Sequence, residues 1–374
     1  MSTTGSRLSD RARLAEIEAE KQAVEGRLDS HQYPVLNLPN ELVSEIFVHF
    51  LPDYPSTPPL FGIHSPNILT HICRKWRDIA LSTPLLWRAI SLEYTRNEKE
   101  QAQMVEAWLT RSRYCPLSLQ AGRYRPIPDS VLAAVLPHSA RWQHVGLRLW
   151  TLEPLFGFEG PMPLLEDLEI FVEIDRTRAC QTFINSPRLR TASLWDWECQ
   201  TNFLPWAQLT SLTLVAHLPG ECAKVLVQTV NLVYCELITC GVGSDLPDVL
   251  LPRLETLVFV AFAAEDSDPS TGYLSTFVLP ALRRLQIPEA FLGPDSIATL
   301  KSFVSKSGCK LQELCVTGPH EVSKRVYREA FSTIHIISFN KRLVDWYCRE
   351  AAQIRWDGRR STADLETLED IYIK

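Results

Sequence analysis

The chain has 374 residues, and at about 150 residues per domain this length predicts two or three folding units. Hydrophobic residues make up 45% and charged residues 22%, as is ordinary for a globular protein, and the net charge of -6 leaves no basic excess to neutralise the phosphates of a nucleic acid. The longest apolar run covers only residues 257–264, far fewer than the about 20 that cross a bilayer, so we expect neither a nucleic-acid partner nor a membrane span.

The first segment, residues 1–31, is polar and charged except for one short stripe. The stripe has heptad-like spacing and consists of Leu14, Ile17, Lys21, Val24 and Leu28. Two heptads are too few for an independent coiled coil. Three alternatives therefore stay open: a helix that is frayed or docks on its own protein, a helix that pairs weakly with a partner, or a disordered segment.

The second segment, residues 32–95, predicts a compact unit of three helices. Pro39 occupies a first helical position, and the spacing of Leu42, Ile46 and Phe50 then places one apolar stripe on the first helix. The four prolines of residues 51–65 predict a loop.

Two cap-plus-proline signals mark the next two helices of this unit. Ser65-Pro66 precedes a stripe formed by Ile68, Ile72, Trp76 and Ile79, and Thr83-Pro84 precedes the last helix. These signals complete the compact three-helix unit.

The third segment, residues 96–320, carries an irregular repeat of three apolar positions with the spacing i, i+3, i+5. The nine triplets are Tyr114-Leu117-Leu119, Trp142-Val145-Leu147, Leu165-Leu168-Ile170, Leu189-Ala192-Leu194, Leu209-Leu212-Leu214, Leu232-Cys235-Leu237, Leu254-Leu257-Phe259, Leu282-Leu285-Ile287 and Leu311-Leu314-Val316. Successive triplets begin 20 to 29 residues apart. The last two positions of each triplet alternate with other residues, as in a strand with one buried face.

Return segments between the triplets complete the predicted architecture. Residues 129–136 and 296–305 have helical character, and prolines before several triplets, at Pro163, Pro187 and Pro252, predict turns. Because each unit alone cannot cover its apolar face, stacked neighbours must share a core. The fold class expected is α+β: an N-terminal helical unit followed by an α/β leucine-rich-repeat-like solenoid with a parallel sheet.

The last segment, residues 321–374, has only a marginal further triplet at Phe331-Ile334-Ile336. A charged helix around residues 341–354 is expected to cap the open end of the solenoid. The acidic stretch at residues 364–370 reads as a solvated face.

The helical unit resembles an F-box, in particular the F-box-like domain of mushroom-type fungal proteins. The residues that carry the resemblance are Leu38-Pro39 with Glu41-Leu42, then Glu45-Ile46-Phe47, then the run from Ile72 to Arg77 with Ile79-Ala80, and finally the run from Thr83 to Trp87. The downstream triplets look like the irregular leucine-rich repeats of the same family, although the asparagine usual in regular repeats is missing.

The resemblance implies a substrate-receptor subunit of a cullin-RING ubiquitin ligase of the SCF type, with the F-box on a Skp-type adaptor. The residues it assigns to adaptor binding are Leu38, Pro39, Leu42, Ile46, Phe47, Cys73, Trp76 and Ala80. Trp76 could equally belong to the internal core of the unit. The same pattern would also suit a helical cap on a leucine-rich-repeat scaffold without ligase association, and exposure of the apolar face at Leu38, Leu42 and Ile46 separates the two readings.

The repeat segment would then bind an unknown client protein. Strand residues that flank the buried pairs, such as Asp167, Thr191 and Arg284, are expected on the concave face. The client-binding candidates are Glu169, Phe171, Trp195, Asp196, Trp197 and Glu236. A core or capping role for the two tryptophans is an equal alternative.

Neither catalysis nor a cofactor is indicated. The chain lacks the Gly-rich, nucleophile-elbow and His-Glu zinc motifs, so we expect no enzyme, no catalytic residue, no cofactor and no metal. The ten cysteines contain no Cys-x-x-Cys pair, and the first residues show no apolar stretch of a secretory signal. We therefore expect reduced thiols and a cytoplasmic or nuclear location.

Overall fold

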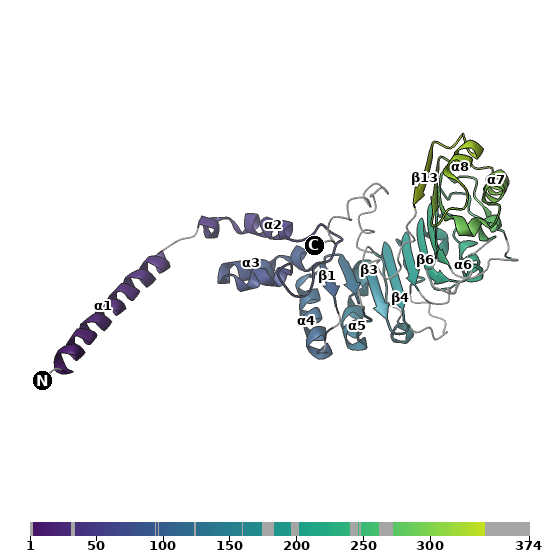
Figure 1. Ribbon diagram of the computed structural model, residues 1–374. Coiled ribbons are helices and arrows are strands. Elements are labelled where there is room, and N and C mark those ends of the chain that lie inside the picture. Colours follow the sequence, from purple (N-terminus) through teal and green to yellow (C-terminus); the bar gives the residue numbers. More distant parts are fainter. Residues whose placement is uncertain are drawn as a thin grey trace.

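The computed structural model describes residues 3–30, 34–93, 95, 97–122, 125–158, 160–173, 183–195, 202–239, 246, 248–261 and 272–340. These residues form an α+β fold around one curved parallel sheet of 11 strands (Figure 1). Along the sheet the strands follow chain order, β1-β2-β3-β4-β5-β6-β7-β9-β11-β12-β13, while β8 and β10 pair separately. The expected parallel sheet is confirmed.

The strands are short, as the triplets predict. The large sheet consists of β1 (Ala89–Leu92), β2 (Leu117–Ala121), β3 (Trp142–Leu149), β4 (Asp167–Val172), β5 (Thr191–Trp195), β6 (Ser211–His217), β7 (Tyr234–Thr239), β9 (Thr256–Ala261), β11 (Arg284–Pro288), β12 (Glu313–Thr317) and β13 (Ile336–Asn340). The small sheet consists of β8 (Val249–Leu250) and β10 (Phe277–Val278).

The register places the middle apolar residue of each triplet beside that of the next. From β3 to β12 the paired residues are Val145, Leu168, Ala192, Leu212, Cys235, Leu257, Leu285 and Leu314. None of them is more than 2% exposed. The triplet spacing therefore predicts both the strands and their pairing, because any other register would move this apolar row out of the core.

The first and the last triplet were assigned the wrong phase. Leu119, rather than Leu117, pairs with Val145, because the register shifts at Leu117, and the proposed anchor Tyr114 is 94% exposed. At the other end Ile337 pairs with Leu314, so the marginal Phe331-Ile334-Ile336 triplet lies three residues too early. Strand β13 ends the sheet with β12 as its one neighbour, whereas β2 pairs with both β1 and β3, so its phase is changed by the local register shift alone.

Helices connect many of the strands. The α-helices are α1 (Thr3–Ser30), α2 (Asn40–Phe50), α3 (Arg74–Ser82), α4 (Glu98–Arg111), α5 (Asp129–Val135), α6 (Pro219–Leu226), α7 (Ser296–Ser307) and α8 (Lys324–Ala330). The 3-10 helices are η1 (Pro34–Asn37), η2 (Pro66–His71), η3 (Pro84–Trp87), η4 (Leu136–Arg141), η5 (Glu153–Leu155), η6 (Trp206–Gln208), η7 (Tyr273–Thr276) and η8 (Glu289–Leu292). The two return helices expected at residues 129–136 and 296–305 are confirmed as α5 and α7.

One apolar core continues from the helical unit into the sheet. Trp87 of η3 packs edge-on against Trp108 of α4, with 4.9 Å between ring centroids, and its indole N–H donates to the Ala80 carbonyl at 2.9 Å. The same buried cluster extends from Val43 on α2 to Phe331 after α8. The helical unit is thus fixed to the first strands by shared packing.

The loop between α2 and η2 adds polar contacts to this junction. Pro58 and Leu60 hydrogen-bond through their backbones to Ser91 of β1, at 2.8 and 3.3 Å. The Tyr54 hydroxyl donates to the Gln143 amide oxygen of β3 at 2.9 Å. The loop therefore runs along the edge of the sheet rather than into solvent.

The second helix of the unit differs from its expectation. The expected continuous helix is interrupted at Cys73, whose backbone is extended (φ -155°). The Cys73 sulfur accepts a hydrogen bond from the Trp76 N–H at 3.5 Å and so caps α3. Ile68 and Ile72 consequently lie off the axis of α3 and are exposed. The predicted Ser65 cap is confirmed, since its hydroxyl oxygen accepts from the Asn67 N–H, whereas Thr83 makes no side-chain cap.

Helix α1 extends away from the rest of the molecule (Figure 1). The side chains of residues 12–27 are all exposed, including Leu14, Ile17 and Val24. Docking of this stripe on its own chain is therefore not seen. The predicted capping helix at residues 341–354 and the acidic tail lie outside the described residues.

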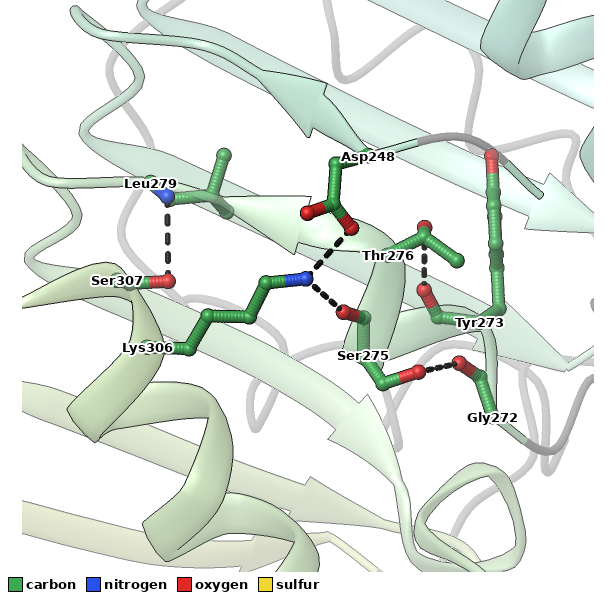
Figure 2. A network of polar contacts seen from close by, with 8 residues as sticks. All are labelled: Asp248, Gly272, Tyr273, Ser275, Thr276, Leu279, Lys306 and Ser307. Atoms are coloured by element: carbon green, nitrogen blue, oxygen red, sulfur yellow. Dashed lines mark hydrogen bonds and ion pairs between the residues drawn. The ribbon is translucent and has the colours of Figure 1, made fainter. Parts of the chain in front are cut away.

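Polar contacts attach α7 to the small sheet (Figure 2). The Lys306 ammonium donates to the Asp248 carboxylate at 2.6 Å and to the Ser275 carbonyl at 2.7 Å. The Ser307 hydroxyl oxygen accepts from the Leu279 N–H at 3.2 Å. No helix in the described part of the chain is long and apolar enough to cross a membrane.

Candidate functional site

Helix α2 has a buried side and an exposed apolar side. Val43 and Phe47 are each 1% exposed and pack in the core, whereas Leu42 and Ile46 are each 54% exposed. Pro39 before the helix is exposed as well, and Leu38 is partly buried. The i, i+4 pair of Leu42 and Ile46 thus forms an apolar surface that the described chain leaves uncovered.

The remaining residues assigned to adaptor binding lie inside or beneath this surface. Phe47 meets Trp76 of α3 edge-on, at 5.0 Å between ring centroids, so Trp76 stands between the two helices as the core alternative requires. Ala80 is fully buried. Phe47 and Ala80 therefore support the unit and do not form part of its surface, while Cys73 is partly buried at the start of α3.

Lysine 75 joins the segment before α2 to α3. Its ammonium donates to the carbonyls of Leu36 and Leu38, at 2.6 and 3.0 Å. These bonds hold η1 and the entry to α2 against α3 and so orient Leu38 and Pro39. Because the ammonium is charged, each of these hydrogen bonds is stronger than one between two neutral groups.

The client-binding candidates lie on the sheet face opposite the main core. Phe171 is partly exposed and packs on Trp195 at 5.7 Å, and the Arg148 guanidinium lies 3.8 Å from the Phe171 ring centre. Trp195 joins Val215, Ile238 and Val260 in a second apolar cluster.

This second cluster changes what the face can offer a partner. Trp195 is 8% and Glu236 only 4% exposed, so the expectation of exposed contact residues is wrong for these two. The Glu236 carboxylate accepts from the Tyr234 hydroxyl at 3.2 Å. Glu169 and Phe171 remain partly exposed, and Asp196 and Trp197 lie outside the described residues.

A polar cavity opens at the amino ends of β3, β4 and β5. Its volume is about 430 Å³, and its lining consists of His144, Glu166, Asp167, Arg188, Arg190 and Thr191. In the sheet, His144 pairs with Asp167 and Asp167 with Thr191. The backbone N–H groups of Arg190 and Thr191 both donate to the Glu166 carbonyl, at 3.0 and 3.1 Å, which fixes the two segments side by side.

Burial perturbs the titratable groups around this cavity. It raises the pKa of the Asp167 carboxyl to about 7, and the nearby Glu169 carboxylate adds to the rise. Burial lowers the pKa of the His144 imidazole, against a smaller opposing effect of Glu166. Burial also raises the pKa of Tyr54, whose ring packs on His144 at 5.6 Å, to about 12.

Sequence reasoning placed Asp167 and Thr191 on this face but did not find the cavity. The missing signal was Arg188 and Arg190, which flank the buried anchor Leu189 and to which the sequence patterns assign no role. Parallel pairing puts the residues just before β5 beside those just before β4. Two carboxylates and two guanidiniums therefore meet at one edge of the sheet.

Comparison with known proteins adds no family to these observations. A scan against protein-family models finds no match, and a search of curated proteins finds no similar sequence. Within the described ranges no group of three or more His, Cys, Asp or Glu side chains is arranged to hold a metal ion.

Proposed function

We propose that this chain is a substrate-receptor subunit of an SCF-type cullin-RING ubiquitin ligase. In this proposal residues 32–95 are an F-box that binds a Skp-type adaptor and, through it, a cullin. Residues 96–320 are an irregular leucine-rich-repeat solenoid that holds a client protein.

The observation that carries the proposal is the exposure of the outer side of α2. Had the helical unit been only a cap, its apolar stripe would be expected against the sheet. Instead α2 packs on α3 and η3 through its inner side with Val43 and Phe47, and Leu42 and Ile46 stay outside. Leaving two such side chains in water costs free energy that an apolar groove on a partner recovers.

The thiols are consistent with a reducing compartment. The six cysteines among the described residues whose state is assigned, Cys73, Cys115, Cys222, Cys235, Cys309 and Cys315, are all free. A cytoplasmic or nuclear site of action is part of the proposal, since ubiquitin ligases of this type act there.

The test is to measure, by isothermal titration calorimetry, the affinity of the full chain for a purified Skp-type adaptor. Leu42→Ala/Ile46→Ala should weaken binding by about thirtyfold or more per buried anchor, because truncating an interface hot spot costs about 2 kcal/mol. Leu218→Ala is the matched control, since Leu218 is 57% exposed but lies before α6, far from the unit in sequence.

Two results would overturn the adaptor proposal. One is a folded wild-type chain that does not bind the adaptor, which would leave the leucine-rich-repeat scaffold as the remaining reading. The other is a double variant that binds as tightly as the wild type, which would place the contact elsewhere than on α2.

A further inference from the structure

The cavity at the amino ends of β3 to β5 holds carboxylates and guanidiniums that do not pair with one another. Among the described residues, no ion pair within 4 Å and no side-chain hydrogen bond involves Glu166 or Asp167. Arg188 is exposed, and its guanidinium makes no ion pair or hydrogen bond with them. The Arg190 guanidinium contacts only backbone carbonyls, those of Pro187 and Leu189, at 3.2 and 2.9 Å.

This arrangement is costly for a protein on its own. A partly buried carboxyl without a cationic partner loses hydration and recovers little in return. Core packing does not explain its presence, because Asp167 lies on the face opposite the main core, where its neighbours in the sheet, His144 and Thr191, also line the cavity.

The charges are also separated within the cavity. Glu166 and Asp167 begin β4, while Arg188 and Arg190 belong to the segment that leads into β5. A ligand with a single sign of charge would satisfy one pair and repel the other. A ligand with a positive and a negative group close together would satisfy both.

We propose that this cavity binds a peptide segment of a client protein in which a lysine or arginine side chain stands next to an acidic one. The basic side chain reaches Asp167 and Glu166, and the acidic side chain reaches Arg188, with Arg190 held beside it by its own backbone. Charge-assisted hydrogen bonds of this kind are about twice as strong as neutral ones and give specificity for the order of charges. The cavity volume of about 430 Å³ accommodates two such side chains.

This inference gives the proposed client-binding domain its substrate class, yet it can be tested without an adaptor. The full chain is immobilised and a phage-displayed library of random dodecapeptides is selected on it. The wild type should enrich a basic residue adjacent to an acidic one about tenfold or more over the starting library, the ratio expected from one charged hydrogen bond of about 1.5 kcal/mol.

The variants separate the two halves of the site. Asp167→Asn should lose the preference for the basic residue and keep that for the acidic residue, whereas Arg188→Ala should do the reverse. Glu313→Gln is the matched control, because Glu313 occupies the corresponding sheet row on β12, outside the cavity, and should leave the selected motif unchanged.

Three results would overturn the inference: no charged motif with the wild type, the same motif with Asp167→Asn as with the wild type, or loss of the motif with Glu313→Gln. Each of these bears on the cavity alone, since failure of adaptor binding is measured separately through Leu42 and Ile46. Circular dichroism of each variant establishes that it is folded.

Discussion

The outer side of α2 and the cavity at β4 differ in chemistry but share a physical situation. On α2 the chain leaves Leu42 and Ile46 in water, where apolar side chains are costly. At β4 it withdraws Asp167 from water, where a carboxylate is costly. In both places side chains sit in the environment that suits them least, and a partner would relieve the cost. The comparison teaches that a candidate binding surface can be recognised either by apolar side chains exposed to water or by a charged side chain withdrawn from it.

The largest expected effect sharpens the contrast between the two sides of α2. Phe47→Ala should lower the free energy of unfolding by about 3–5 kcal/mol, because it removes a fully buried ring that packs on Trp76. Leu42→Ala, four residues of helix away from Ile46 on the outer side, should change it by less than about 0.5 kcal/mol. Urea denaturation of both variants makes the comparison, and a large loss for Leu42→Ala would mean that this side is packed in solution.

The next effect concerns the junction that joins the two regions. Trp87→Ala should cost about 3–5 kcal/mol and should destabilise the helical unit and the sheet together, because the ring lies in the core that both share. A single cooperative unfolding transition followed by fluorescence and by circular dichroism is expected for both wild type and variant. Two separate transitions in the wild type would show that the regions fold independently.

Removing the charge of Asp167 on β4 should have a smaller effect on the free energy of unfolding, and of opposite sign. The folded state holds the Asp167 proton up to about pH 7, whereas the unfolded chain releases it near the ordinary value of 3.8. The group therefore lowers the free energy of unfolding as the pH rises through this interval, and the loss is complete above about pH 7. Asp167→Asn should raise the free energy of unfolding at pH 8 by about 1 kcal/mol or more, the equivalent of one pKa unit, and change it little at pH 4.

Glu313→Gln is again the control for this measurement, since it makes the same chemical change on β12. Denaturation at both pH values tests the sign. A variant Asp167→Asn that is less stable than wild type at pH 8 would show that the carboxylate is stabilised in the free protein, and the contrast with α2 would fail.

The smallest expected change in the free energy of unfolding comes from Lys306, a charged side chain that is already paired. Lys306→Met should lower the free energy of unfolding by less than about 1 kcal/mol, because its ion pair with Asp248 is exposed to solvent and screened. Thermal denaturation at low and high salt measures the change, which should shrink as salt rises. A paired surface charge and an unpaired buried one would thereby be compared within one molecule.

Much of the sheet could be predicted from local spacing. The triplets from Trp142 to Val316 identify strands and register because each strand has a neighbour on both sides and one row of side chains must stay in the core. The prediction failed at Tyr114, where the register of β2 shifts, and at Phe331, which precedes the last strand of the sheet. It also failed at Cys73, because a helical stripe continues in the spacing even where the backbone turns away.

The candidate sites could be predicted less well, for a specific reason. Exposure of Leu42 and burial of Phe47 follow from which side of α2 meets η3 and α3, which spacing alone leaves undecided. The partial burial of Trp195 and Glu236 follows from neighbours on β6, β7 and β9 that are far away in the chain.

The sequence by itself determined the order of elements, the parallel pairing of the central strands and the two-sided pattern of α2, because apolar periodicity is a local property of the chain. Only the tertiary structure decided which side of α2 faces outward and that Asp167 meets the arginines before β5. Those outcomes depend on how closely segments more than 20 residues apart in the chain approach one another. The sheet sets this distance through its roughly 4.8 Å strand spacing, and no local sequence pattern encodes it.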